Sequence, residues 1–189
     1  PMVERARAQY PELTFEVCDA LSLPFEGEFD VVFSNAVFHW IADHDTLLEN
    51  VKKALKPGGQ LICEFGGAGN IAVVEQAFNR ACEEMGLAVR APRFNFPTPE
   101  EFSARLAHHG VTPVNVYDYD RPTPLKDGEQ GLANWMRQFF AGQLEALPEQ
   151  TGQALLARAE ELARPELWDG DHWTADYRRL RAVARKPAE

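Results

Sequence analysis

Hydrophobic and polar residues along the chain follow two different periods, which indicates a mixed α/β protein. Short runs of alternating or continuous apolar residues predict three strands, at residues 13–18, 29–34 and 60–65. Apolar residues spaced three and four apart predict three helices, at residues 44–55, 70–85 and 98–109. Strands that alternate with helices of this length favour right-handed crossover connections and a parallel sheet.

Residue types that begin and end helices support these boundaries. Asp43 directly precedes the first of the three helices, and Thr98 followed by Glu101 has the pattern of a capping box. Gly86 and Gly110 follow the other two helices, where glycine supplies the left-handed backbone that ends a helix.

The last third of the chain predicts a helical insertion between two strands. Residues 111–119 predict a strand, residues 129–165 have a helical pattern, and residues 177–185 alternate charged and apolar side chains. That alternation is typical of an exposed or edge strand. We therefore expect one domain over residues 1–189, with a lid-like helical insertion at residues 124–170.

The first residues of the sequence have the pattern of a helix whose beginning is missing. Residues 2–9 have a helical composition that Tyr10-Pro11 ends, and no capping residue precedes them. Because helices seldom begin without a cap, we expect an upstream portion of the protein to be absent from this sequence.

Composition and charge narrow the classes of partner. The formal net charge of −10 argues against nucleic-acid binding, which needs a basic surface. No apolar run reaches the ~20 residues that span a bilayer. Cys18, Cys63 and Cys82 lack metal-ligand spacing, and we expect Cys18 and Cys63 to be buried in a reduced, cytoplasmic protein. A small-molecule substrate and a protein substrate are the partners that remain.

In open parallel sheets, ligands bind beyond the carboxyl ends of the strands. Three short segments follow predicted strands there, at residues 19–21, 34–36 and 66–67. Asp19 offers an acceptor and the next backbone N–H groups offer donors, a combination that matches the edge of an adenine. Asp19 could equally cap the turn that follows it, and spacing alone leaves both interpretations open.

Residues 67–72 match the dinucleotide-binding pattern G-x-G-x-x-G/A. Such a site also needs an acidic residue about 20 residues later at a strand end, and the residues around Leu87 offer none. We therefore favour the interpretation that this segment leads the chain away from the sheet toward the substrate side.

Three blocks of sequence resemble class I S-adenosylmethionine-dependent methyltransferases in their order and gaps. They are FEVCDALSLPF at residues 15–25, FDVVFSNA at residues 29–36 with His39-Trp40 after it, and LKPGGQL at residues 55–61. The resemblance is strong over residues 2 to about 66 and weaker from there on, where residues 178–185 resemble the family's closing antiparallel hairpin. Within the class, Asn35-Ala-Val-Phe-His-Trp40 is similar to the matching stretch of trans-aconitate methyltransferase-like enzymes.

This resemblance implies a Rossmann-like, mostly parallel sheet with a C-terminal antiparallel strand pair, and S-adenosyl-L-methionine as cofactor. It implies that Asp19 accepts from the adenine amino group, with Ala20 and Leu21 at the ring edge and Asn35 and Ala36 near the methionine portion. The family's glycine-rich loop and the acidic residue for the ribose have no counterpart in this sequence.

Methyl transfer from a sulfonium is an in-line displacement, so the enzyme mainly aligns the acceptor and excludes water. A carboxylate acceptor needs no base, whereas a hydroxyl or an amine does. His39 is the candidate catalytic base, and the alternative is a hydrogen-bonded wall residue. An acidic acceptor would need a cationic partner, for which Arg93, Arg121 and Arg137 are candidates.

The acceptor side is expected to involve Trp40 together with Trp135 and Arg137 of the insertion, because such insertions cover the site in this family. Two classes of function are open. One is a methyltransferase for a small-molecule acceptor, with carboxylic acids among the candidates; the other is a catalytically inactive, methyltransferase-like interaction protein. An intact upstream glycine-rich loop would favour the enzyme.

Overall fold

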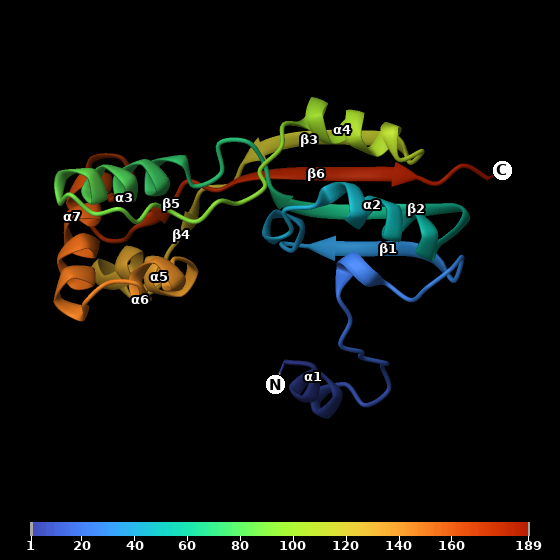
Figure 1. Cartoon of the computed structure of the whole chain (residues 1–189), viewed down its shortest axis with the longest axis horizontal. Coiled ribbons are helices and arrows are strands. Elements are labelled where there is room, and N and C mark those ends of the chain that lie inside the picture. The colour runs from blue at the N-terminus through green and yellow to red at the C-terminus, as the bar shows by residue number, and fades with distance from the viewer. Residues whose placement is uncertain (1, 189) are drawn as a thin grey trace.

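The computed structural model describes residues 2–188, in which a sheet with its helices lies beside a separate group of helices (Figure 1). The helices are α1 (Met2–Gln9), α2 (His44–Ala54), α3 (Ala72–Glu84), α4 (Pro99–His108), α5 (Gly131–Phe139), α6 (Ala141–Glu145) and α7 (Glu149–Leu167). The strands are β1 (Phe29–Asn35), β2 (Leu55–Gly66), β3 (Thr112–Asp120), β4 (Thr123–Pro124), β5 (Thr174–Ala175) and β6 (Arg178–Arg185). Single 3-10 turns are η1 (Ala20–Ser22), η2 (Phe38–Trp40) and η3 (Gly128–Gln130).

The main sheet has the strand order β1-β2-β6-β3. β1 and β2 are parallel, while β6 is antiparallel to both of its neighbours. The helices α5 to α7 lie between β3 and β6 in the sequence. The expected α/β fold, with an antiparallel strand pair at its C-terminal end and a helical insertion before the last strand, is confirmed.

The last strand lies inside the sheet, so the prediction of an exposed or edge strand was wrong. β6 pairs with β2 on one side and with β3 on the other. Its alternate residues Leu180, Ala182 and Ala184 are fully buried. Arg179, Arg181, Val183 and Arg185 lie on the opposite face of the sheet, which accounts for the alternation that the sequence shows.

The strand predicted at residues 13–18 is also absent. This segment has no regular secondary structure and pairs with no strand among the described residues. Val17 is 85% exposed and Cys18 is exposed as well, so the expected burial of Cys18 is wrong. Residue types that favour strands still need a neighbouring strand to accept their hydrogen bonds, and β1 leaves its outer edge unpaired with this segment.

The helices α2 and α4 cover one face of the sheet and form its core. Leu48 of α2 and Phe102 of α4 are fully buried against Leu61 and Phe65 of β2. The opposite side is called the outer face here. Phe33, Ile62 and Val183 lie in register across three strands on that face, and Phe33 is 71% exposed.

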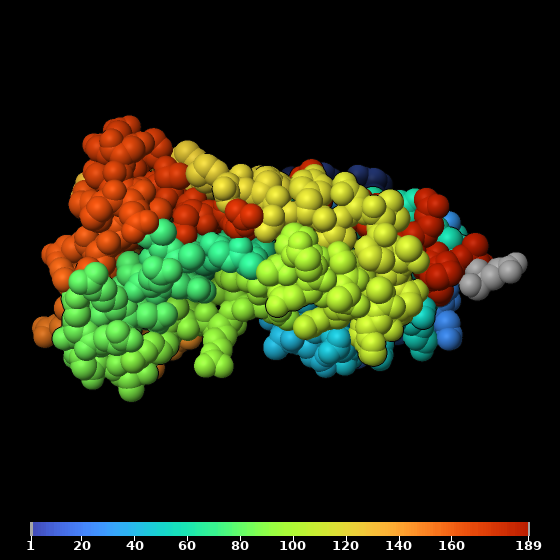
Figure 2. All heavy atoms as spheres, turned by 90° about the horizontal axis from the view of Figure 1, so that it is seen from above, coloured from blue at the N-terminus to red at the C-terminus, as the bar shows by residue number. Residues whose placement is uncertain are grey.

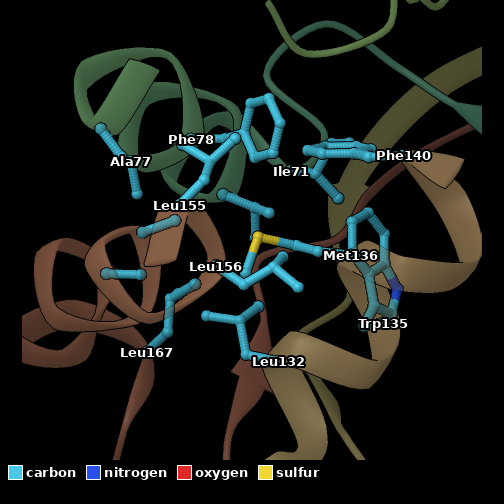
Figure 3. Packing of buried hydrophobic residues seen from close by; sticks show 14 of the residues in the cluster. Ile71, Ala77, Phe78, Leu132, Trp135, Met136, Phe140, Leu155, Leu156 and Leu167 are labelled. Carbon is cyan, nitrogen blue, oxygen red and sulfur yellow. The ribbon is translucent and has the colours of Figure 1, made fainter. Parts of the chain in front are cut away.

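A second hydrophobic core holds the helical unit together, which consists of α3, α5, α6 and α7. Side chains of α3, α5 and α7 point toward one another around Met136 (Figure 3). Phe78 of α3 and Phe140 are fully buried there in an edge-to-face contact, with 5.0 Å between their ring centroids. Figure 2 shows α3 and α7 side by side at one end of the molecule. The sheet is therefore not covered by the helix that follows β2.

The capping residues act as the sequence predicts. The Asp43 carboxylate accepts from the backbone N–H of Thr46 at 2.9 Å. The Thr98 hydroxyl accepts from the N–H of Glu101 at 3.2 Å, and the Glu101 carboxylate accepts from the N–H of Thr98 at 2.8 Å. Among residues 2–188, no helix is both long enough and apolar enough to cross a membrane.

Candidate functional site

A cavity of about 130 Å³ lies where the sheet and the helical unit meet, and we call it the aromatic pocket. Its walls come from the loop after β1, the segment before α3, the connector between α3 and α4, helix α5 and the start of β6. The lining residues are Ala36, His39, Trp40, Asn70, Ile71, Phe94, Phe96, Trp135, Phe139, Tyr177 and Arg179.

The pocket begins at the carboxyl end of β1, where the backbone is strained. Ala36 has a positive φ of 57°, and its N–H donates to the carbonyl of Glu64 at 2.7 Å. Ile71 on the opposite wall also has a positive φ, of 54°. Left-handed backbone is costly for residues other than glycine and is found preferentially at functional sites.

Asn95 fixes the loop that carries His39 and Trp40. Its backbone N–H donates to the carbonyl of His39 at 3.0 Å. Its side-chain amide donates to the carbonyls of Ile41 and Ala42 at 3.2 and 3.1 Å. The connector between α3 and α4 therefore holds one wall of the pocket in place.

His39 is a neutral ring whose orientation is set by the backbone. The N–H of Gly66 donates to its Nδ1 at 3.2 Å. Burial, followed by the charges of Arg179 and His44, lowers the pKa of His39 from 6.5 to about 4. With Nδ1 accepting, the proton of the neutral ring lies on Nε2, where it can be donated.

Aromatic side chains form most of the pocket wall. Trp40 contacts Phe94 edge-to-face with 5.0 Å between ring centroids, and stacks with Phe139 at 6.1 Å. Phe94 stacks on Phe96 at 5.3 Å. The wall is thus apolar and suited to the flat or hydrocarbon part of a small molecule.

The far side of the pocket carries a cation on an aromatic support. Trp135 Nε1 donates to the hydroxyl of Tyr177 at 2.6 Å. The guanidinium of Arg179 lies over the Tyr177 ring, 4.5 Å from its centroid. Trp135 was expected at the acceptor side, but sequence reasoning missed Arg179, Phe94 and Phe96, none of which belongs to a motif.

Four of the predicted site residues come together in this pocket, and the others do not. Ala36, His39, Trp40 and Trp135 line it, whereas Arg137 lies in a separate hollow beside Leu144. The Arg137 guanidinium donates to Asn134 at 3.0 Å.

The other two candidate cations also lie outside the pocket. Arg121 pairs with Glu64 at 2.9 Å, and Arg93 borders a different hollow that shares His39 and Trp40. Among the described residues, no group of His, Cys, Asp or Glu could hold a metal ion.

Asp19, Ala20 and Leu21 lie outside the pocket: Asp19 is exposed, while Ala20 and Leu21 are half-buried and pack against the core of the sheet. The Asp19 side chain caps η1, because one carboxylate oxygen accepts from the N–H of Leu21 at 2.9 Å. The Leu21 N–H is therefore already bonded, while the other oxygen of Asp19 makes no hydrogen bond with residues 2–188. Asn35 and Ala36 are exposed at the end of β1, where the Ala36 N–H is already bonded to the carbonyl of Glu64.

The segment that matched the dinucleotide pattern meets an acidic side chain of the protein itself. Asp176 accepts from the N–H of Val73, in the first turn of α3, at 2.7 Å. A carboxylate thus lies at the helix N-terminus where a dinucleotide phosphate would bind. Asn70 and Ile71 of this segment line the aromatic pocket instead.

Comparison with known proteins agrees with this architecture. Residues 1–63 match a family model described as a methyltransferase domain. An uncharacterized methyltransferase of Schizosaccharomyces pombe is 27% identical over 90% of this chain and 67% of its own length. A trans-aconitate 2-methyltransferase of Methylobacterium nodulans is 30% identical over 72% of this chain and 54% of its own length. The YcgJ protein of Bacillus subtilis has a similar fold, with a TM-score of 0.64 and 17% identity over 98% of this chain and 78% of that one.

The chain is similar to class I S-adenosylmethionine-dependent methyltransferases. Among these it is similar to the trans-aconitate methyltransferases. The chain spans between about a quarter and two thirds of the length of the first curated relatives that it matches.

Proposed function

We propose that this chain provides the acceptor side of an S-adenosylmethionine-dependent methyltransferase, and that the acceptor is a small carboxylic acid. The observation that carries the proposal is the aromatic pocket, which opens beside Ala36 at the carboxyl end of β1. Ligands of open α/β sheets bind at that edge. Relatives that are named trans-aconitate 2-methyltransferases support an acidic acceptor.

The residues available for the cofactor form a partial site. The free oxygen of Asp19 would accept from the adenine amino group, with Ala20 and Leu21 beside the ring. The exposed residues Asn35 and Ala36 would lie along the methionine portion. When bound, the cofactor supplies a methyl group on a positively charged sulfur, which a nucleophile can displace.

In this proposal His39 acts as a hydrogen-bond donor, and its role as a base stays a prediction. A group with a pKa of about 4 is a weak base, and Nδ1 is already bonded to the N–H of Gly66. Nε2 can instead donate to an oxygen of the acceptor. A carboxylate carries its own nucleophilic oxygen, so this arrangement suits it without proton removal.

The remaining task of the pocket is to orient the acceptor and exclude water. Trp40, Phe94 and Phe139 enclose the apolar part of a ligand, and Asn95 holds the loop that carries Trp40. Fixing two reactants in line contributes roughly 7–11 kcal/mol toward lowering a barrier. The chain needs no further chemical group for this step.

The test starts with cofactor binding to the 189-residue chain. Isothermal titration with S-adenosylhomocysteine should show binding, and labelled S-adenosylmethionine should transfer methyl groups to members of a panel of small carboxylic acids. Absence of both at millimolar ligand would contradict the proposal and favour a non-catalytic interaction protein.

Asp19→Asn is the informative variant for the adenine contact. An asparagine keeps the oxygen that caps η1 but presents an amide N–H₂ in place of the free oxygen, toward a group that is itself a donor. Binding of S-adenosylhomocysteine should weaken while the melting temperature stays unchanged. Unchanged affinity would show that the adenine lies elsewhere.

A further inference from the structure

Arg179 is the charged side chain of the aromatic pocket, since His39 is neutral and the other described lining residues carry no charge. It extends from the start of β6 and packs its guanidinium over the ring of Tyr177, 4.5 Å from the centroid. The Tyr177 hydroxyl is in turn held by the indole N–H of Trp135. The cation is therefore supported on one side and directed into the cavity.

The acidic residues around Arg179 are already used by other cations. Glu64 lies on the neighbouring strand β2, and one of its oxygens accepts from Arg121 at 2.9 Å. Its other oxygen accepts from the Tyr119 hydroxyl at 2.8 Å and from the guanidinium of Arg181. Both oxygens of Glu64 thus already accept from other groups, and no hydrogen bond joins Glu64 to Arg179 among the described residues.

The adjacent arginine, Arg178, is paired with carboxylates and serves as a comparison. Arg178 forms ion pairs with Asp118 at 3.0 Å and with Asp120 at 2.6 Å. Arg179, by contrast, makes no hydrogen bond or ion pair through its side chain with any residue in 2–188. Burial lowers the pKa of Arg179, and the charge of nearby Glu64 offsets that effect only in part.

An unpaired and partly buried cation is costly to a protein, and the cost is removed when an anion binds. The net charge of the chain is −10, so the positive charge of Arg179 in the aromatic pocket is opposite in sign to the charge of the whole chain. The planar guanidinium matches the two oxygens of a carboxylate, which it can bind through two parallel hydrogen bonds. The aromatic wall beside it suits an apolar body attached to that carboxylate.

We propose that Arg179 is the residue that selects anionic acceptors, by holding a carboxylate of the ligand in the aromatic pocket. This inference rests on the proposed function for the identity of the ligand as an acceptor. It assigns the role to Arg179, in place of Arg137, which lies in another hollow. Arg179 acts in binding and specificity, while the methyl transfer itself occurs at an oxygen that the guanidinium does not hold.

The experiment uses benzoate as an anionic probe and benzamide as its neutral match. Both are added to the 189-residue chain, and tryptophan fluorescence reports binding because Trp40 and Trp135 line the pocket. Benzoate should bind more tightly than benzamide. Arg179→Gln should weaken benzoate binding on the order of tenfold or more, the range expected for charge-assisted hydrogen bonds, and should leave benzamide unaffected.

Two further variants make the result specific. Arg80→Gln removes the same charge from an exposed site on α3, where the side chain is 68% exposed, and should leave benzoate binding unchanged. Arg137→Gln tests the rival cation. Equal benzoate affinity in the wild type and in Arg179→Gln, or a loss only in Arg137→Gln, would overturn the inference.

A second readout follows the ring of His39 by NMR. Because the Arg179 charge lowers the pKa of His39, bound benzoate should raise that pKa, and so should Arg179→Gln without ligand. A loss of packing alone would not produce the first effect.

The outcomes also separate this inference from the proposed function. If S-adenosylhomocysteine binds and acids are methylated, but Arg179→Gln leaves the KM for those acids unchanged, only the inference fails. If benzoate binding depends on Arg179 but no cofactor binds, only the proposed function fails.

Discussion

The backbone N–H of Gly66 and Nδ1 of His39 are 3.2 Å apart, which joins the end of β2 to the loop after β1. This bond leaves the imidazole no free lone pair when the ring is neutral. The loop and the strand therefore hold the ring in one tautomer at the mouth of the aromatic pocket.

His39→Gln should change how stability depends on pH. The pKa of His39 falls from 6.5 to about 4 in the folded protein, so the unfolded chain binds more protons between these values. The contribution to the free energy of unfolding is present above pH 6.5 and is lost as the pH falls toward 4, by up to about 3 kcal/mol. Urea unfolding at pH 7.5 and at pH 4.5 should show a smaller loss in His39→Gln. Equal losses in the two proteins would mean that the ring is not buried as described.

Glu75 should affect the free energy of unfolding with a pH dependence opposite to that of His39, and Glu75→Gln tests this. Burial and the neighbouring carboxylate of Asp176 raise the pKa of Glu75 from 4.5 to about 7. The folded state thus binds the proton more tightly, and stability falls as the pH rises from about 4.5 to 7. Glu75→Gln should unfold at higher urea than the wild type at pH 8 and should show no such gain at pH 4. Glu83→Gln, on the same helix with 64% of its side chain exposed, serves as the control.

Ala36→Gly should stabilise the protein by about 1 kcal/mol, because glycine adopts left-handed backbone without strain. Ala36 is exposed with a φ of 57°, so little packing is lost with its methyl group. Ala42→Gly, an exposed alanine in the same loop that has no positive φ, should instead be neutral or destabilising. Thermal melts of both variants measure the difference. A loss of stability in Ala36→Gly would show that the strain is not there.

Tyr177→Phe should cost about 1–2 kcal/mol, because the indole N–H of Trp135 loses its acceptor while only 8% of that residue is exposed. The ring that supports Arg179 is kept, so benzoate affinity should change little. Tyr117→Phe removes a hydroxyl from an exposed tyrosine and should lie within about 0.5 kcal/mol of the wild type. Equal urea midpoints for the two variants would contradict the role of the Trp135 hydrogen bond.

Local signals in the sequence were sufficient where an element depends on its own residues. The capping box at Thr98 and the cap at Asp43 form as predicted, because both partners of each hydrogen bond lie within one turn. Errors arose where the outcome depends on distant partners. Residues 13–18 have strand-forming composition but no neighbouring strand in the described chain, and β6 shows edge-like alternation although it lies between two strands.

For the candidate site, too, residues within a motif could be predicted, whereas a residue that depends on distant partners could not. His39 and Trp40 of the motif and Trp135 of the insertion line one pocket, while their roles in catalysis and acceptor binding stay predictions. Arg179 was missed because nothing in the sequence distinguishes it from Arg178 and Arg181, which lie on the same strand. Which of these arginines lacks a carboxylate is decided by Glu64, Asp118 and Asp120, and these are brought to β6 only by the fold.

The two separate hydrophobic cores have a consequence for how the molecule responds to its ligand. The aromatic pocket takes Ala36 and His39 from the sheet side and Trp135 and Phe139 from the helical side. A molecule bound there touches both bodies at once and couples them thermodynamically. Calorimetry should therefore record melting that becomes more cooperative as the pocket fills, with the two halves of the protein losing structure together instead of in succession.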